Sequence, residues 1–136
     1  MKEAPKYQLE QRTLEFSVRV IKHCARLKQP AIRSVNDQLI RSATSIGANY
    51  AEANNAASKT DFRSKIYIAK KEAAETKYWL RLLKELGDSS EEILMLLEEV
   101  QGILMTLQKI VNTLNSAPEN GKPKTQGKLK TENRKT

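Results

Sequence analysis

The chain has 136 residues, 39% hydrophobic and 29% charged, which fits one globular domain, and few glycines and prolines favour long helices over a turn-rich β fold. Its net charge of +8 either keeps a small domain soluble or attracts a polyanion such as nucleic acid. A single cysteine excludes an internal disulfide, and MKEAPKYQLE lacks the apolar segment of a signal peptide, so we expect a cytoplasmic protein without a membrane span.

Two amphipathic helices are predicted in the first half of the chain. One covers residues 7–28, and the next covers about 35–57, after Ser34 as the N-cap. The first has the apolar stripe Leu9, Thr13, Phe16, Val20, Cys24 and Leu27, and beside it a second stripe of Leu14, Val18, Ile21 and Ala25. The second helix has the stripe Leu39, Ala43, Ile46, Tyr50, Ala53 and Ala57. One helix of a lone bundle needs only one apolar face, so the second stripe indicates an additional contact.

Two further helices complete the predicted domain. One runs from about Asp61, capped by Thr60, to Leu86 before Gly87, and Ser89 with Glu92 forms a capping box that opens the last helix, which runs through Leu114. Short loops force neighbouring helices to be antiparallel, so residues 1–116 are predicted to form an all-α, up-down-up-down four-helix bundle. Residues 117–136 are predicted to be a disordered basic tail, because they lack any apolar period.

The sequence offers little catalytic chemistry. His23 is the only histidine, and we expect it on a helix flank, while a zinc site needs more Cys and His than are present. Glu72 and Glu75 are three residues apart, but the Glu-x-x-His pair of di-iron bundles does not occur. We therefore expect no enzyme, no metal and no cofactor.

Basic residues recur along two of the predicted helices. On the third helix they repeat every seven residues, and on the first helix a similar row contains one acid, whereas the fourth helix begins with glutamates. Three interpretations remain open: solvated surface, a phosphate-binding surface, or a subunit interface in which a basic face meets the acidic helix of a neighbour. The candidate phosphate contacts are Arg12, Arg19, Arg26, Arg63, Lys70, Lys77, Arg81 and Lys84, with Lys122, Lys124, Lys128 and Lys130 of the tail.

Small residues form a ridge on the second helix. Ala43, Gly47 and Ala51 lie four residues apart, and a glycine within a helix costs about 1 kcal/mol relative to alanine. The ridge therefore indicates a close helix contact, either within the chain or with another subunit. Arg41 and Glu52 share a face but lie too far apart to pair, so each must find water, another helix or another chain. We treat all five as candidates for an oligomer interface or close packing.

The segment LIRSATSIGANYAEA, followed by DFRSKIYIAKKEAAETKYWLRLLKELG, resembles the 23S rRNA intervening-sequence protein family over about residues 10–115. The matching positions are Arg41, Ser45, Ile46, Asn49, Ala51 and Glu52. The resemblance implies a left-handed bundle that often assembles as a ring of five, and a related accessory variability determinant binds nucleic acid and a reverse transcriptase. The expected function is a non-catalytic homo-oligomer that binds RNA or DNA as an accessory factor. The alternative is a protein-interaction scaffold with no nucleic-acid role.

Overall fold

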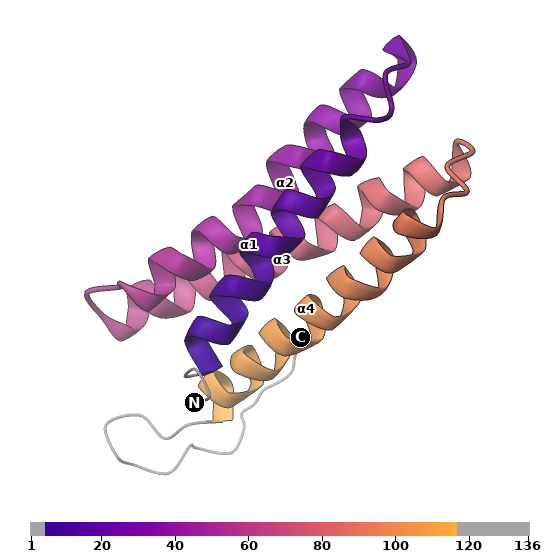
Figure 1. The fold of residues 1–136 in the computed structure, drawn as a ribbon. Coiled ribbons are helices and arrows are strands. Elements are labelled where there is room, and N and C mark those ends of the chain that lie inside the picture. The colour runs from indigo at the N-terminus through magenta and orange to yellow at the C-terminus, as the bar shows by residue number, and fades with distance from the viewer. Residues whose placement is uncertain (1–4, 117–136) are drawn as a thin grey trace.

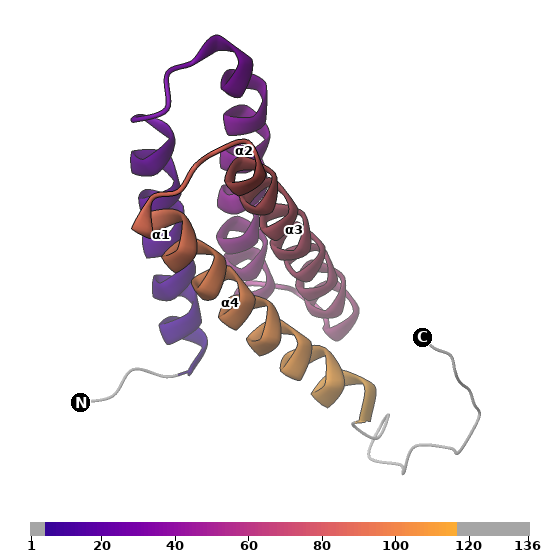
Figure 2. The same ribbon diagram turned by 90° about the vertical axis from the view of Figure 1, so that its right-hand side faces the viewer.

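The structure, a computed structural model, describes the backbone of residues 5–116 and side chains from Gln8 onward. Four helices follow one another: α1 (Pro5–Cys24), α2 (Pro30–Asn54), α3 (Lys59–Glu85) and α4 (Glu91–Ser116). Each helix runs back alongside the preceding one, and α4 returns to contact α1 (Figures 1 and 2). The predicted all-α four-helix fold is confirmed. The predicted tail, with its four candidate lysines, lies outside the described residues.

α2 and α3 begin earlier than predicted and have other N-caps than the predicted ones. Gln29 is extended, with ψ of 132°, and Pro30 begins α2, so the N-cap predicted at Ser34 was wrong. Proline suits the first turn of a helix because its fixed φ is helical and its missing N–H has no partner there in any case. In α3 the cap is Ser58 and not Thr60, because the Ser58 hydroxyl accepts the N–H of Asp61 at 3.0 Å.

The α3–α4 corner was predicted more closely. Gly87 ends the turn after α3 with φ of 114°, a conformation that favours glycine because a Cβ would be strained there. The cap of α4 lies one residue later than predicted, since the hydroxyl of Ser90, not Ser89, accepts the N–H of Ile93 at 3.2 Å. α1 ends at Cys24 and α2 at Asn54, each a few residues short of its predicted end.

The core follows the predicted stripes except in α4 and at Ala57, which is exposed and lies beyond the end of α2. Phe16, Leu39, Ile66 and Leu80 are almost completely buried, as are most of the positions expected around them. In α4, Leu96 and Ile103 are fully buried, although the predicted stripe passed through Leu97 and Leu104, which are half-buried. None of the helices within residues 5–116 is long and apolar enough to cross a membrane.

The small-residue ridge of α2 packs against α1 of the same chain. A Cβ on Gly47 would lie 2.9 Å from Thr13 Oγ1 and 3.2 Å from Thr13 Cβ. One turn earlier, the Ser17 hydroxyl donates to the carbonyl oxygen of Ala43 at 3.3 Å, and Ala43 is fully buried. Of the two alternatives left open by the sequence, the intramolecular contact therefore holds for Ala43 and Gly47, while Ala51 is half-buried.

Candidate nucleic-acid interface

The basic row of α3 lies on the flank that borders α4. The guanidinium of Arg63 donates to Asn115 Oδ1 at 2.9 Å and to the carbonyl oxygen of Leu114 at 3.2 Å. Two turns of α3 beyond Lys70, the amine of Lys77 donates to Gln101 Oε1 at 2.8 Å. All three acceptors are uncharged, so they orient the cations without neutralising their charge.

Other members of this row extend the positive surface. Lys70 has no polar partner within residues 5–116, and the same is true of the exposed Arg81 and Lys84. Along α3 the row from Arg63 to Lys84 spans about 32 Å, at about 1.5 Å per residue. Tyr67 lies among these cations, 40% exposed, with its hydroxyl 3.3 Å from Asn115 Oδ1.

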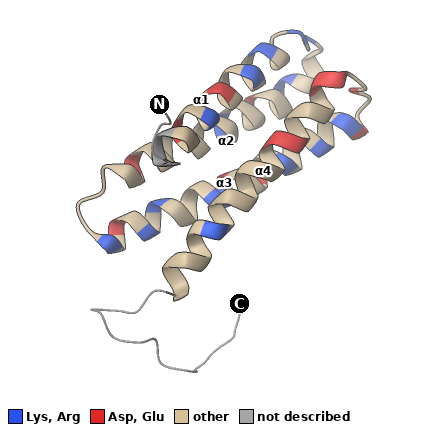
Figure 3. Cartoon of the chain, turned by 60° about the horizontal axis from the view of Figure 1, so that its bottom comes forward, with Lys and Arg blue, Asp and Glu red and all other residues tan. Residues whose placement is uncertain are grey.

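The part of α4 that contacts Arg63 and Lys77 is free of carboxylates. The acidic residues of α4 all lie in its first half, and residues 100–116 contain no Asp or Glu (Figure 3). Their place is taken by amides, namely Gln101, Gln108, Asn112 and Asn115. The α3–α4 face, which we define as Arg63, Tyr67, Lys70, Lys77 and these amides, therefore presents unneutralised positive charge beside hydrogen-bonding groups.

In the basic row of α1, two arginines are paired with carboxylates. Arg12 Nε lies 2.6 Å from Glu99 Oε2, and Arg19 Nε lies 3.2 Å from Glu92 Oε2. The acidic start of α4 thus meets α1 of the same chain, where the sequence had left open a meeting with a neighbouring subunit. Among the α1 candidates, only Arg26 is exposed without a polar partner in the described part of the chain.

His23 forms a third polar contact, between α1 and the loop before α4. Its Nε2 lies 2.6 Å from Asp88 Oδ2, and both side chains are less than a tenth exposed. The prediction that His23 lies on a helix flank was therefore wrong. The other carboxylate oxygen of Asp88 accepts the N–H and the hydroxyl of Ser90, the cap of α4. Asp88 thus connects the end of α1 to the start of α4.

The pKa of Asp88 reflects two opposing effects. Burial alone would raise the pKa, but the hydrogen bonds from Ser90 and His23 outweigh burial and lower it below its usual 3.8. Because the folded-state pKa is the lower one, the stabilising contribution is complete above the unfolded-state pKa. It is lost as pH falls through the folded-state pKa.

We expect Asp88→Asn to lower the free energy of unfolding by about 1.5–3 kcal/mol at pH 7, the usual range for a hydrogen bond to a charged group. The difference from the wild type should shrink as pH is lowered from 5 to 2, because the wild-type carboxylate then takes up a proton. Urea denaturation at a series of pH values measures both quantities. Glu91→Gln, at an exposed carboxylate of α4, is the control and should change stability little at any of these pH values. A difference that stays constant with pH would contradict the assignment.

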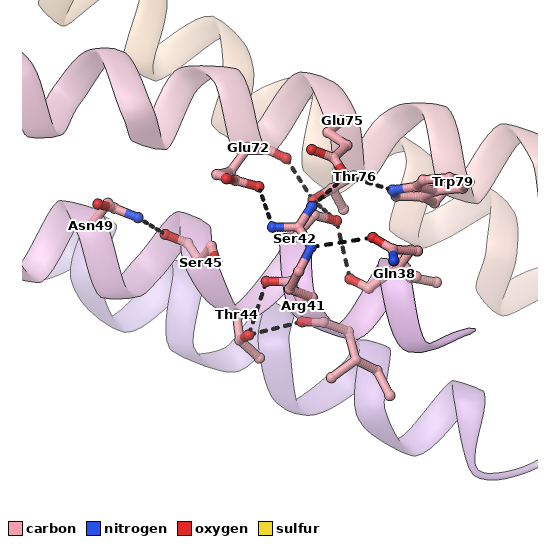
Figure 4. A network of polar contacts seen from close by, with 12 residues as sticks. Gln38, Arg41, Ser42, Thr44, Ser45, Asn49, Glu72, Glu75, Thr76 and Trp79 are labelled. Atoms are coloured by element: carbon pink, nitrogen blue, oxygen red, sulfur yellow. Dashed lines mark hydrogen bonds and ion pairs between the residues drawn. The ribbon is translucent and has the colours of Figure 1, made fainter. Parts of the chain in front are cut away.

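Arg41, the first of the positions that match the family pattern, joins α2 to α3. Its guanidinium contacts Glu72 Oε1 at 3.2 Å and also Glu75, and Trp79 Nε1 donates to Glu75 at 3.0 Å (Figure 4). The hydrogen bonds from Trp79 and then from Arg41 lower the pKa of Glu75. On the same face, Lys65 of α3 lies 2.8 Å from Glu52. Arg41 and Glu52 therefore both find partners on another helix, one of the outcomes that the sequence allowed.

The groups considered for catalysis are held in structural contacts. Glu72 and Glu75 bind Arg41, and residues 5–116 contain no cluster of three or more His, Cys, Asp or Glu side chains suited to a metal. Cys24 is buried, and burial, with the charges of Asp37 and Asp88, raises the pKa of its thiol to about 11. A thiol with so high a pKa is a poor nucleophile at neutral pH.

The α1–α4 ion pairs were not predicted, although the sequence contained a signal for them. Arg12 and Arg19 are seven residues apart, and so are Glu92 and Glu99. In antiparallel neighbours such equal spacing brings both pairs together at once. Gly102 was a second signal, since a Cβ at this position would collide with the guanidinium of Arg12.

These features define an all-α bundle with a basic face and no recognisable catalytic centre among its described residues. Residues 6–112 match the family described as 23S rRNA-intervening sequence protein, and the chain belongs to that family. A similar crystal structure is that of a protein with unknown function from the S23 ribosomal protein family of Bacteroides thetaiotaomicron. It is 34% identical with a TM-score of 0.70, over 77% of this chain and 99% of that chain. No curated protein matches the chain.

Proposed function

We propose that this protein is a non-catalytic, homo-oligomeric bundle that binds RNA or DNA by charge through its α3–α4 face and acts as an accessory factor. Phosphates would be contacted by Arg63, Lys70 and Lys77, with Arg81 and Lys84 extending the contact along α3. Cations held by uncharged neighbours suit the phosphate backbone, which is bound with little dependence on base sequence. An enzyme acting on nucleic acid, such as a reverse transcriptase, is the kind of protein partner that an accessory factor would serve.

The observation that carries this proposal is the contrast between the two basic rows. Arg12 and Arg19 of the α1 row are paired with carboxylates, whereas Arg63 and Lys77 contact only amide and carbonyl oxygens. The α3 row therefore retains the charge that a polyanion would neutralise. Tyr67 is the one aromatic residue of the α3–α4 face as defined above, which is too little for a stacking platform, so contacts to the backbone of the nucleic acid are favoured over base stacking.

The experiment that tests the proposal is a titration of a 20-base-pair duplex at several salt concentrations. If three phosphates are neutralised, the logarithm of the affinity should fall with the logarithm of salt concentration with a slope of about −2.7, at about 0.9 per phosphate. Native mass spectrometry of protein purified with and without nuclease would report co-purifying nucleic acid. Affinity independent of salt, or partners that are unchanged by nuclease, would instead favour the protein-interaction scaffold.

The homo-oligomer is proposed from an exposed apolar stripe of α1. Leu14 is 58% exposed, Val18 43% and Ile21 45%, and these positions share one face of the helix. Ile21 lines a hollow together with Ala25 and with Ile40 of α2, so the apolar surface continues onto the neighbouring helix. A second copy of the chain would cover this α1–α2 face, and the expected assembly is a ring of five.

We expect Val18→Asp to shift the native mass from the oligomer toward the monomer, because a carboxylate at the centre of the stripe would be buried without a partner. Size-exclusion chromatography with light scattering measures the change. Ser64→Asp, which adds the same charge at an exposed site on α3, is the control and should leave the mass unchanged. A wild-type monomer, or equal behaviour of the two variants, would contradict the assigned interface.

A further inference from the structure

The seam between α1 and α4 carries two ion pairs and a histidine–aspartate contact. Arg12–Glu99 and Arg19–Glu92 follow one another along it, and His23–Asp88 closes its end. α4 lies between the two basic rows, with the α3 row along one flank and these α1 arginines along the other (Figure 3). The glutamates on the α1 flank therefore neutralise Arg12 and Arg19 and limit the positive charge on this side of α4.

The two arginine–glutamate pairs remain accessible to solutes. The side chains of Arg12 and Arg19 are 39% and 35% exposed, and those of Glu99 and Glu92 are 25% and 28% exposed. Pairs that are open to solvent to this degree stabilise a fold by only about 0–1 kcal/mol each. Their main electrostatic effect is to cancel two positive charges that a phosphate could otherwise reach.

The position of Arg12 is also shaped by the backbone of α4. A side chain on Gly102 would collide with the guanidinium of Arg12, so the glycine leaves room for the arginine to lie along α4 and to contact Glu99 through both Nε and Nη2. A two-point contact to a carboxylate occupies the same donors that would bind a phosphate.

We propose that Glu92 and Glu99 are internal counter-ions that mask Arg12 and Arg19 and so confine nucleic-acid binding to the α3 side of α4. The proposal rests on the proposed function. The carboxylates are fixed on α4 and need no association from solution, so they hold the arginines in the absence of ligand. Without them, a nucleic acid on the α3 row could reach across α4, whose diameter with side chains is about 10–12 Å, to two further cations.

The test compares Glu92→Gln/Glu99→Gln with Glu91→Gln/Glu98→Gln. Both variants remove two negative charges from α4, but Glu91 and Glu98 are exposed and hold no arginine in the described residues. We expect the Glu92/Glu99 variant to bind a 20-base-pair duplex about ten-fold or more tightly at 0.1 M salt, with a salt slope steeper by about 1.8 for two added phosphates. The Glu91/Glu98 variant should gain much less and keep the wild-type slope.

Adding Arg12→Gln and Arg19→Gln to the Glu92/Glu99 variant restores the wild-type net charge and should remove the gain. Circular dichroism and thermal melting show whether each variant is folded. If the Glu92/Glu99 variant is not folded, the single variant Glu99→Gln is compared with the wild type in its place. Equal gains in the two double variants, or no gain in either, would overturn the masking role. The proposed function is tested separately, by the loss of binding when Arg63, Lys70 and Lys77 are replaced. The masking role can therefore fail while the proposed function stands.

Discussion

Arg63→Glu/Lys70→Glu/Lys77→Glu is expected to abolish binding of the duplex, with a loss of at least about 100-fold at 0.1 M salt. Three phosphate contacts at about 0.9 units of salt slope each account for this loss, and the new carboxylates add repulsion. The fold should survive, because these side chains donate only to surface acceptors on α4. A gel shift or fluorescence anisotropy titration, with circular dichroism on the same sample, measures both properties.

The matched control is Lys22→Glu/Lys28→Glu/Lys71→Glu. It makes the same change in net charge at three exposed lysines outside the α3–α4 face. Lys71 is the most closely matched of the three control positions, because it follows Lys70 in the sequence but points about 100° away around α3. The control should weaken binding only slightly. If both triple variants lose affinity equally, binding depends on net charge alone and the α3–α4 face is not the site.

Gly47→Leu is expected to lower the free energy of unfolding by about 3 kcal/mol or more, the upper part of the range for overpacking a close contact. The colliding atoms belong to Thr13, whose branched side chain is stiff and whose hydroxyl is bonded to the carbonyl oxygen of Glu10 at 2.9 Å. Little relief is therefore available without moving α1 away from α2. Urea denaturation followed by far-ultraviolet circular dichroism measures the loss.

Ala48→Leu provides the comparison for this variant. Ala48 is the next residue of the same helix but is exposed, so the larger side chain should change the free energy of unfolding by less than about 0.5 kcal/mol. Adding Thr13→Ala to Gly47→Leu should recover part of the loss, because it removes the nearest atoms. A stable Gly47→Leu protein whose native mass is lower than that of the wild type would instead place the ridge at a subunit interface.

The sequence predicts the helices and most of the core because both depend on local spacing. The stripes through Phe16 and Val20 and through Ile66 and Leu80 both repeat at helical spacing, and both are buried. α4 is rich in leucine on adjacent positions, so spacing alone could not decide between Leu96 and Leu97. Only the packing against α1 and α3 places Leu96 and Ile103 fully inside.

The site was predictable only where it lies on one helix. The α3 row was visible because its members repeat along a single segment, and Arg41 was predicted to find water, another helix or another chain. His23 was misplaced because its partner, Asp88, is 65 residues away in a loop. The pairing of Arg12 and Arg19 with α4 likewise depends on how two distant helices are aligned, which neither helix specifies by itself.

The three α1–α4 contacts also fix the axial register of the two helices. The intervals along α1, from Arg12 to Arg19 to His23, are seven and four residues, and those from Glu99 and Glu92 of α4 to Asp88 in the loop before it are the same in reverse. A slide of α4 by seven residues could bring one arginine opposite another glutamate, but it would leave His23 and Asp88 unmatched. Because the intervals are unequal, all three contacts form together in only one alignment of the two helices. They therefore favour the native register over shifted registers that leucine packing alone would tolerate.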